Sequence, residues 1–143
     1  MARYYPVSPL LWDDTAVRRW DDASRLLAVY LLTCRHRNLE GLYRLPWTYV
    51  ESDLSWSTEK VSAAVNTLID DDFIEYDPEA EVVFVRNALK YQSPKSKLQI
   101  KGALNALEAV PSTELMDAFV EAAGTHAPDF RKALASHSNG FGK

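Results

Sequence analysis

The chain has 143 residues, of which 47% are hydrophobic and 25% charged. This is the composition of a single globular domain, and it excludes a disordered protein. The one cysteine excludes an internal disulfide, and the longest apolar run, Leu26 to Leu32, is too short to cross a membrane. With no apolar signal-peptide core at the N-terminus, these features predict a cytoplasmic protein without membrane contact.

The first third of the chain predicts two helices. Two prolines make the segment from Tyr4 to Trp12 extended or turn-like. A short helix is expected at Thr15 to Arg19, followed by a longer one at about Ala23 to Cys34. The wide apolar surface of the second helix predicts a central core position, with Cys34 as a buried structural thiol.

A strand and a two-helix unit are predicted next. Gly41 to Leu45 alternates like a strand, and Pro46 suits the first position of a helix at about Trp47 to Asp53. After a tight turn, Ser57 is expected to cap another helix. That helix has the clearest amphipathic pattern in the chain, with apolar residues at i, i+3, i+4, i+7 and i+8: Val61, Ala64, Val65, Leu68 and Ile69.

A hairpin follows. Its predicted strands are Phe73 to Tyr76 and Val82 to Val85, joined by a turn at Asp77 to Ala80. Beyond a linker, three weaker helices are expected. Ile100 to Leu107 carries the apolar face of one; Ser112 caps the next and Gly124 ends it; the third begins near Pro128.

This order of elements predicts a mainly α (α+β) protein, a winged helix-turn-helix with a small β-hairpin wing and additional C-terminal helices. The expected organisation is a winged-helix domain with an N-terminal extension at residues 1–92. A basic linker and C-terminal helices, residues 93–135, are expected to pack on the same domain. Residues 136–143 form a small, polar tail that is expected to be disordered.

Charge is strongly segregated along the chain, although the net charge is only −4. Asp70 to Glu81 contains seven acidic residues and no basic one, whereas Val82 to Leu107 contains five basic residues and no acidic one. A second basic cluster is Arg35, His36 and Arg37, with Arg44 nearby. Only part of the surface is therefore suited to an anionic partner.

Several segments resemble a known family. They are Tyr4 to Asp14, Glu40 to Pro46, the hairpin strands and Arg86 to Gln92. Over Tyr4 to Pro111 the chain resembles the N-terminal winged-helix domain of bacteriophage replisome-organiser or replication-initiation proteins, the DnaD-like group. The resemblance implies binding to double-stranded origin DNA and recruitment of host or phage replication proteins in a bacterial cytoplasm, usually by a homo-oligomer such as a dimer.

The helix after Ser57 is the expected recognition helix. In a major groove its Asn66 would pair with adenine and its Lys60 would reach guanine or a phosphate. The acidic residues at its end and in the wing favour instead a helix that packs the core and presents a plain polar face. Residues Arg86 to Lys101 suit phosphate contacts, or equally a solvated linker and helix face. The residues predicted to contact DNA are Lys60, Ser62, Asn66, Arg86, Lys90, Lys95, Lys97, Lys101, Arg35, Arg37 and Arg44.

No catalytic, metal or cofactor site is predicted. Ser57 to Lys60 matches the spacing of a Ser-Lys nucleophile motif, but Ser57 is better explained as a helix cap. The three histidines lack metal-ligand spacing, and the five glycines form no phosphate loop. Two hypotheses follow: a DNA-binding module of a phage-type replication initiator, or a protein-interaction or oligomerisation module that has lost DNA contact.

Overall fold

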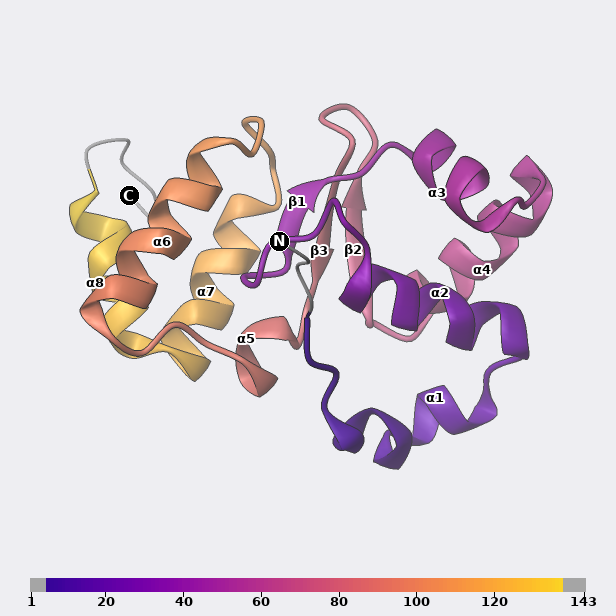
Figure 1. The fold of residues 1–143 in the computed structure, drawn as a ribbon, viewed down its shortest axis with the longest axis horizontal. Coiled ribbons are helices and arrows are strands. Elements are labelled where there is room, and N and C mark those ends of the chain that lie inside the picture. The colour runs from indigo at the N-terminus through magenta and orange to yellow at the C-terminus, as the bar shows by residue number, and fades with distance from the viewer. Residues whose placement is uncertain (1–4, 138–143) are drawn as a thin grey trace.

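A small sheet lies between two groups of helices (Figure 1). The computed structural model describes residues 5–137. The helices of the first group and the three strands of the sheet come first in the chain. They are η1 (Pro9–Asp13), α1 (Thr15–Arg19), α2 (Asp22–Thr33), β1 (Leu42–Arg44), α3 (Trp47–Leu54), α4 (Thr58–Asp70), β2 (Ile74–Asp77) and β3 (Val82–Val85). The second group comprises α5 (Ala88–Tyr91), α6 (Lys97–Glu108), α7 (Met116–His126) and α8 (Pro128–Ser136). The predicted mainly α (α+β) class is confirmed.

Side-chain caps set several of the helix starts. The Asp21 carboxylate accepts the Ser24 backbone N–H at 2.9 Å at the start of α2, and the pKa of Asp21 is lowered by its hydrogen bonds to Ser24. Ser57 caps α4 as predicted, accepting the Lys60 N–H at 3.2 Å. Between α3 and α4 the chain turns at Ser55, whose φ is 56°. This tight turn fixes the angle between the two helices.

The sheet is antiparallel with strand order β1-β3-β2. Leu42 of β1 pairs with Phe84, and Ile74 of β2 pairs with Val85. Gly41, just before β1, has a φ of 79°, and a Cβ there would lie 2.4 Å from the Cβ of Ala88. Only glycine fits this backbone conformation and this close approach.

The sheet has a hydrophobic core on each face. On one face, Val83 and Val85 pack with α2, α3 and α4. On the other, Phe84 packs with α6, α7 and α8, and its ring lies edge-on to Phe119, with 5.9 Å between centroids. Figure 1 shows α2 to α4 on one side of the sheet and α6 to α8 on the other. All four residues of β3 are buried, because both faces of this strand are covered.

Two predictions about the C-terminal helices are wrong. α7 begins at Met116 rather than after Ser112, because Thr113 organises the preceding turn: its Oγ1 accepts the Leu115 N–H and donates to Asp77. Gly124 does not end α7, which continues to His126. The η1 helix also replaces part of the turn expected before Trp12. Most of the tail predicted to be disordered, residues 138–143, lies outside the described residues, and Ser136 is the last residue of α8.

No helix within residues 5–137 is both long enough and apolar enough to span a bilayer.

Candidate nucleic-acid interface

The outer face of α4 presents the predicted base-contacting residues. Ser62 and Asn66 are exposed and lie one helical turn apart. Lys60 is exposed too, and its ammonium lies 4.8 Å from the centroid of the Trp56 ring, in cation–π geometry. α4 therefore offers one cation and two short polar side chains to a partner.

The surroundings of α4 are acidic. Between Ser57 and Glu81 the chain has eight acidic residues and one basic residue. Asp71 is held in place by the Trp20 indole N–H, which donates to it at 2.6 Å. Asp77, by contrast, is buried and structural: the Thr113 hydroxyl donates to it at 2.7 Å, and this hydrogen bond lowers the pKa of Asp77. An anionic ligand approaching α4 would meet a concentration of negative charge.

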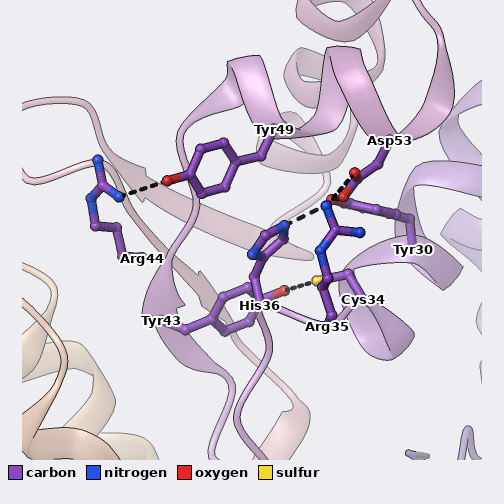
Figure 2. A network of polar contacts seen from close by, with 8 residues as sticks. All are labelled: Tyr30, Cys34, Arg35, His36, Tyr43, Arg44, Tyr49 and Asp53. Carbon is purple, nitrogen blue, oxygen red and sulfur yellow. Dashed lines mark hydrogen bonds and ion pairs between the residues drawn. The ribbon is translucent and has the colours of Figure 1, made fainter.

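A polar network joins α2, α3 and the segment between α2 and β1 (Figure 2). Its centre is Asp53, which accepts hydrogen bonds from the Tyr30 hydroxyl at 2.6 Å and from the Arg35 guanidinium at 2.8 Å. The His36 Nε2 lies 3.4 Å from the same carboxylate, without hydrogen-bond geometry. The Tyr30 hydrogen bond, followed by Arg35, lowers the pKa of Asp53. Arg35 is exposed, but its charge is paired with Asp53.

The predicted second phosphate edge is not assembled. Arg37 is only 4% exposed, its guanidinium donates to the Leu32 carbonyl oxygen, and its Cζ lies 5.1 Å from the centroid of the Tyr5 ring. The prediction that Arg37 contacts phosphate at the surface is wrong, because its side chain is enclosed. The sequence alone does not reveal this enclosure. Arg44 is exposed, but it donates to Tyr49 and to Glu81, both at 3.1 Å (Figure 2 shows the Tyr49 contact).

The same network contains the single cysteine. Cys34 is buried, as predicted, and its Sγ lies 3.8 Å from the Tyr43 hydroxyl oxygen. Burial raises the pKa of the Cys34 thiol. A buried thiol with a raised pKa is a poor nucleophile, so this residue has a packing role.

The basic residues after β3 differ in their surroundings. Arg86 forms an ion pair with Glu75 at 2.5 Å, and the Lys90 ammonium lies 5.5 Å from the centroid of the Tyr91 ring. Lys95, Lys97 and Lys101 are exposed. No ion pair joins these three lysines to an acidic residue within the described part of the chain.

The three lysines gather at the start of α6. Ser96 and Gln99 form a capping box there: Ser96 Oγ accepts the Gln99 N–H at 3.1 Å, and Gln99 Oε1 accepts the Ser96 N–H at 3.3 Å. Lys97 and Lys101 are one turn apart on the helix. The positive end of the α6 dipole adds to the charge of the lysines. This group, Lys95, Lys97 and Lys101, is called the α6 lysine cluster below.

The predicted contact residues do not share one surface. α4 and α6 lie toward opposite ends of the long axis of the molecule, with the sheet between them (Figure 1). Lys60, Ser62 and Asn66 are therefore separated from the α6 lysine cluster by both cores. One short stretch of straight duplex cannot be expected to contact both groups at once.

A cavity beside α6 was not anticipated from the sequence. Its volume is about 470 Å³, and its walls come from four parts of the chain: Tyr5, the segment from Arg37 to Glu40, the linker from Gln92 to Pro94, and α6. Glu40 is 4% exposed and lines this cavity. The only sequence signal for this cavity was the pair of charged residues Arg37 and Glu40, on either side of Asn38 and Leu39. Charged residues are usually exposed, so the pair did not predict a cavity.

Residues 5–137 contain no group of three or more His, Cys, Asp or Glu side chains that could hold a metal ion. Comparison with protein-family models, with curated proteins and with solved structures gave no match to this chain.

Proposed function

We propose that the chain is the DNA-binding module of a phage-type replication-initiation protein with a winged-helix fold, and that its main contact with DNA is made by the α6 lysine cluster. The observation that carries the proposal is the grouping of three exposed, unpaired lysines at one helix start. Phosphate neutralisation by lysine and arginine supplies most non-specific affinity for DNA.

The order of elements supports the winged-helix part of the proposal. α3 and α4 are joined by a tight turn and followed by the β2–β3 hairpin, and α2 packs against α4. β1 completes the sheet beside β3. This is the order of the winged helix-turn-helix plan, in which the hairpin is the wing.

The distribution of paired and unpaired cations supports the place of contact. Arg35, Arg44 and Arg86 each have an acidic partner within 3.1 Å, so each would have to give up an ion pair to bind phosphate. The α6 lysine cluster would give up none. The positive end of the α6 dipole also favours an anion, which makes the start of α6 the better phosphate site.

Replacing two lysines of the cluster tests this function. Lys97→Gln with Lys101→Gln removes two exposed charges, so the slope of log affinity against log salt for a random duplex should fall by about 2. The measurement is fluorescence anisotropy across a salt series. Arg18→Gln with Arg19→Gln is the charge-matched control, because these exposed residues lie on α1, away from α6 (Figure 1). An unchanged slope in the α6 variant contradicts the proposal.

A second candidate function is favoured by the acidic end of α4 and the hairpin. Five exposed acidic residues that form no ion pair within the described residues suit a basic protein surface, such as a replication protein or a second copy of the chain: Glu59, Asp70, Asp71, Asp72 and Glu79. In that case the chain is an interaction or oligomerisation module. Absence of duplex binding at low salt, together with a dimer by light scattering, would favour this candidate over the first.

A further inference from the structure

Two helices carry charges that oppose their own dipoles. The positive end of a helix dipole favours acidic residues, yet α6 has no acidic residue in its first turn and begins beside Lys95 and Lys97. The negative end favours basic residues, yet α4 has none in its last turn and ends at Asp70, followed by Asp71 and Asp72. These three aspartates are called the α4 acidic end below. Each of the two helix ends would be stabilised by a partner of opposite charge.

Neither helix end finds such a partner within its own chain. The α4 acidic end and the α6 lysine cluster are both exposed, and no ion pair within residues 5–137 involves either group. The Trp20 indole N–H holds the Asp71 carboxylate but does not neutralise its charge. α4 and α6 lie on opposite sides of the sheet, so the two groups cannot meet in one molecule (Figure 1). A contact between them requires a second copy of the chain.

Each charged group also has an exposed apolar side chain beside it. Leu98, which is 80% exposed, follows Lys97 and lies one helical turn from Lys101. Ile69, which is 37% exposed, directly precedes the α4 acidic end. Protein interfaces bury apolar side chains at their centre and place polar groups at the rim. Both surfaces therefore have the composition of a protein contact, whereas a phosphate would use only the lysines.

We propose that the α4 acidic end of one copy docks on the α6 lysine cluster of a second copy, with Ile69 and Leu98 at the centre of the contact. Because the two surfaces differ, a bound pair keeps one surface of each kind free, and further copies add head to tail. The contact occupies the lysines to which the proposed function assigns DNA. Its regulatory consequence rests on that proposed function: a duplex and a second copy compete for the same lysines.

Sedimentation velocity of the wild type tests the association. At about 20 mM salt the average mass should rise with protein concentration and pass that of a dimer, and at about 0.5 M salt it should return to that of a monomer, because salt screens contacts between exposed charges. A monomer at low salt up to about 1 mM protein, or a dimer whose mass does not grow, overturns the proposal.

Two complementary variants test which surfaces meet. Lys97→Gln with Lys101→Gln neutralises the basic surface, and Asp70→Asn with Asp72→Asn neutralises the acidic one. Asparagine tolerates the φ of 59° that Asp72 adopts, and Asp71, which is hydrogen-bonded, is left unchanged. Each variant alone should stay monomeric where the wild type assembles. An equimolar mixture should form a heterodimer that does not grow, because it contains one intact surface of each kind.

Glu114→Gln with Glu121→Gln is the control with the same loss of negative charge. Both residues are exposed and lie outside α4, so this variant should assemble like the wild type. Variants of the lysines or aspartates that still assemble alone, or a mixture of the two that stays monomeric, overturn the pairing of these surfaces.

Leu98→Gln separates the protein contact from the DNA contact. It removes apolar surface without changing charge, so self-association should weaken about tenfold. The salt dependence of duplex binding should stay as in the wild type, because phosphates contact only the lysines. Leu26→Gln makes the same change at an exposed leucine of α2 and should alter neither property. Self-association that is unchanged in Leu98→Gln overturns the proposed contact.

A short random duplex, added in excess so that each duplex holds at most one copy, tests the competition. The sedimenting mass should fall from that of the assembly to that of one protein with one duplex. A duplex that binds while the assembly stays intact overturns the shared surface. If no duplex binds, the proposed function fails, whereas the mixture of complementary variants still decides whether two copies dock in this way.

Discussion

Two carboxylates, Asp53 and Glu40, have opposite surroundings. Asp53 accepts hydrogen bonds from Tyr30 and Arg35, and these partners lower its pKa. Glu40 has one oxygen without a partner, and burial raises its pKa to about 7. The ionised form is therefore favoured at Asp53 and disfavoured at Glu40. At the scale of single residues, Glu40 is the group whose titration should be visible near neutral pH.

Glu40→Gln should change how stability depends on pH. The pKa of Glu40 in the folded protein lies above its ordinary value. The contribution of Glu40 to the free energy of unfolding is therefore fully present below about pH 4.5 and is lost as pH rises through about 7. Urea unfolding should therefore show the wild type losing stability across this window relative to Glu40→Gln. The difference well above pH 7 should be on the order of 3 kcal/mol, from a rise of the pKa from 4.5 to about 7.

Glu121→Gln controls for the loss of one negative charge, because Glu121 is exposed on α7. The prediction is contradicted if the Glu40→Gln and wild-type stabilities run parallel from pH 4.5 to 8.

The partners of charged residues were beyond reach of the sequence. Arg44 and Arg86 were predicted to contact DNA. In the structure Arg44 pairs with Glu81, in the turn before β3, and Arg86 pairs with Glu75 of β2. Which residues meet across a sheet depends on strand register, and no local pattern encodes it. The α6 lysines were recognised as basic from the sequence, but only the structure separates them from the paired arginines.

At the scale of elements, caps decide where several helices begin. Ser57 precedes a long amphipathic pattern and was identified as a cap from the sequence. Ser112 had the same appearance but caps nothing, since α7 has Leu115 at its N-cap position and no side-chain cap. The turn there is organised by Thr113, whose hydroxyl donates to Asp77 of β2. A contact across 36 residues overrides the local signal.

Ser96, which caps α6, and Ser112, which caps no helix, provide a matched pair of substitutions. Ser96→Ala removes half of the α6 capping box and should lower the free energy of unfolding by about 1 kcal/mol. Ser112→Ala should leave it unchanged. Thermal or urea unfolding followed by circular dichroism measures both, and amide hydrogen exchange should quicken in the first turn of α6 only for Ser96→Ala. Equal effects of the two substitutions would contradict the capping assignment.

At the scale of the whole molecule, one sheet serves two cores. In β3, Val82 to Val85 are all apolar and do not alternate, as in a strand covered on both faces, but this pattern was not recognised from the sequence. The sequence also did not indicate which helices would cover the second face. The apolar patterns of α6 to α8 are short and weak, and their packing partners, Leu42 and Phe84, lie more than ten residues away in sequence. The early elements were therefore predicted well and the second layer only in outline.

Because β3 belongs to both cores, a substitution that destabilises one core should also lower the stability of the other. Leu134 of α8 is fully buried, and Leu134→Ala should cost about 2–5 kcal/mol. All four tryptophans, Trp12, Trp20, Trp47 and Trp56, precede the hairpin. Their fluorescence should nevertheless report the loss, with the same midpoint as circular dichroism.

Lys132→Ala is the control for that substitution, because Lys132 is exposed on the same helix. Two separate transitions, with the tryptophan midpoint unshifted in Leu134→Ala, would show that the layers unfold independently.

The double-sided strand also constrains how the protein is made. A ribosome releases α2, α4 and the hairpin before α6, α7 and α8, so the sheet can form while one of its faces has no cover. During that interval Leu42, Val82 and Phe84 face water, although all three are buried in the finished protein. We therefore expect the nascent chain to pass through a stage with an exposed apolar sheet face, of the kind that chaperones bind, until the last helices emerge.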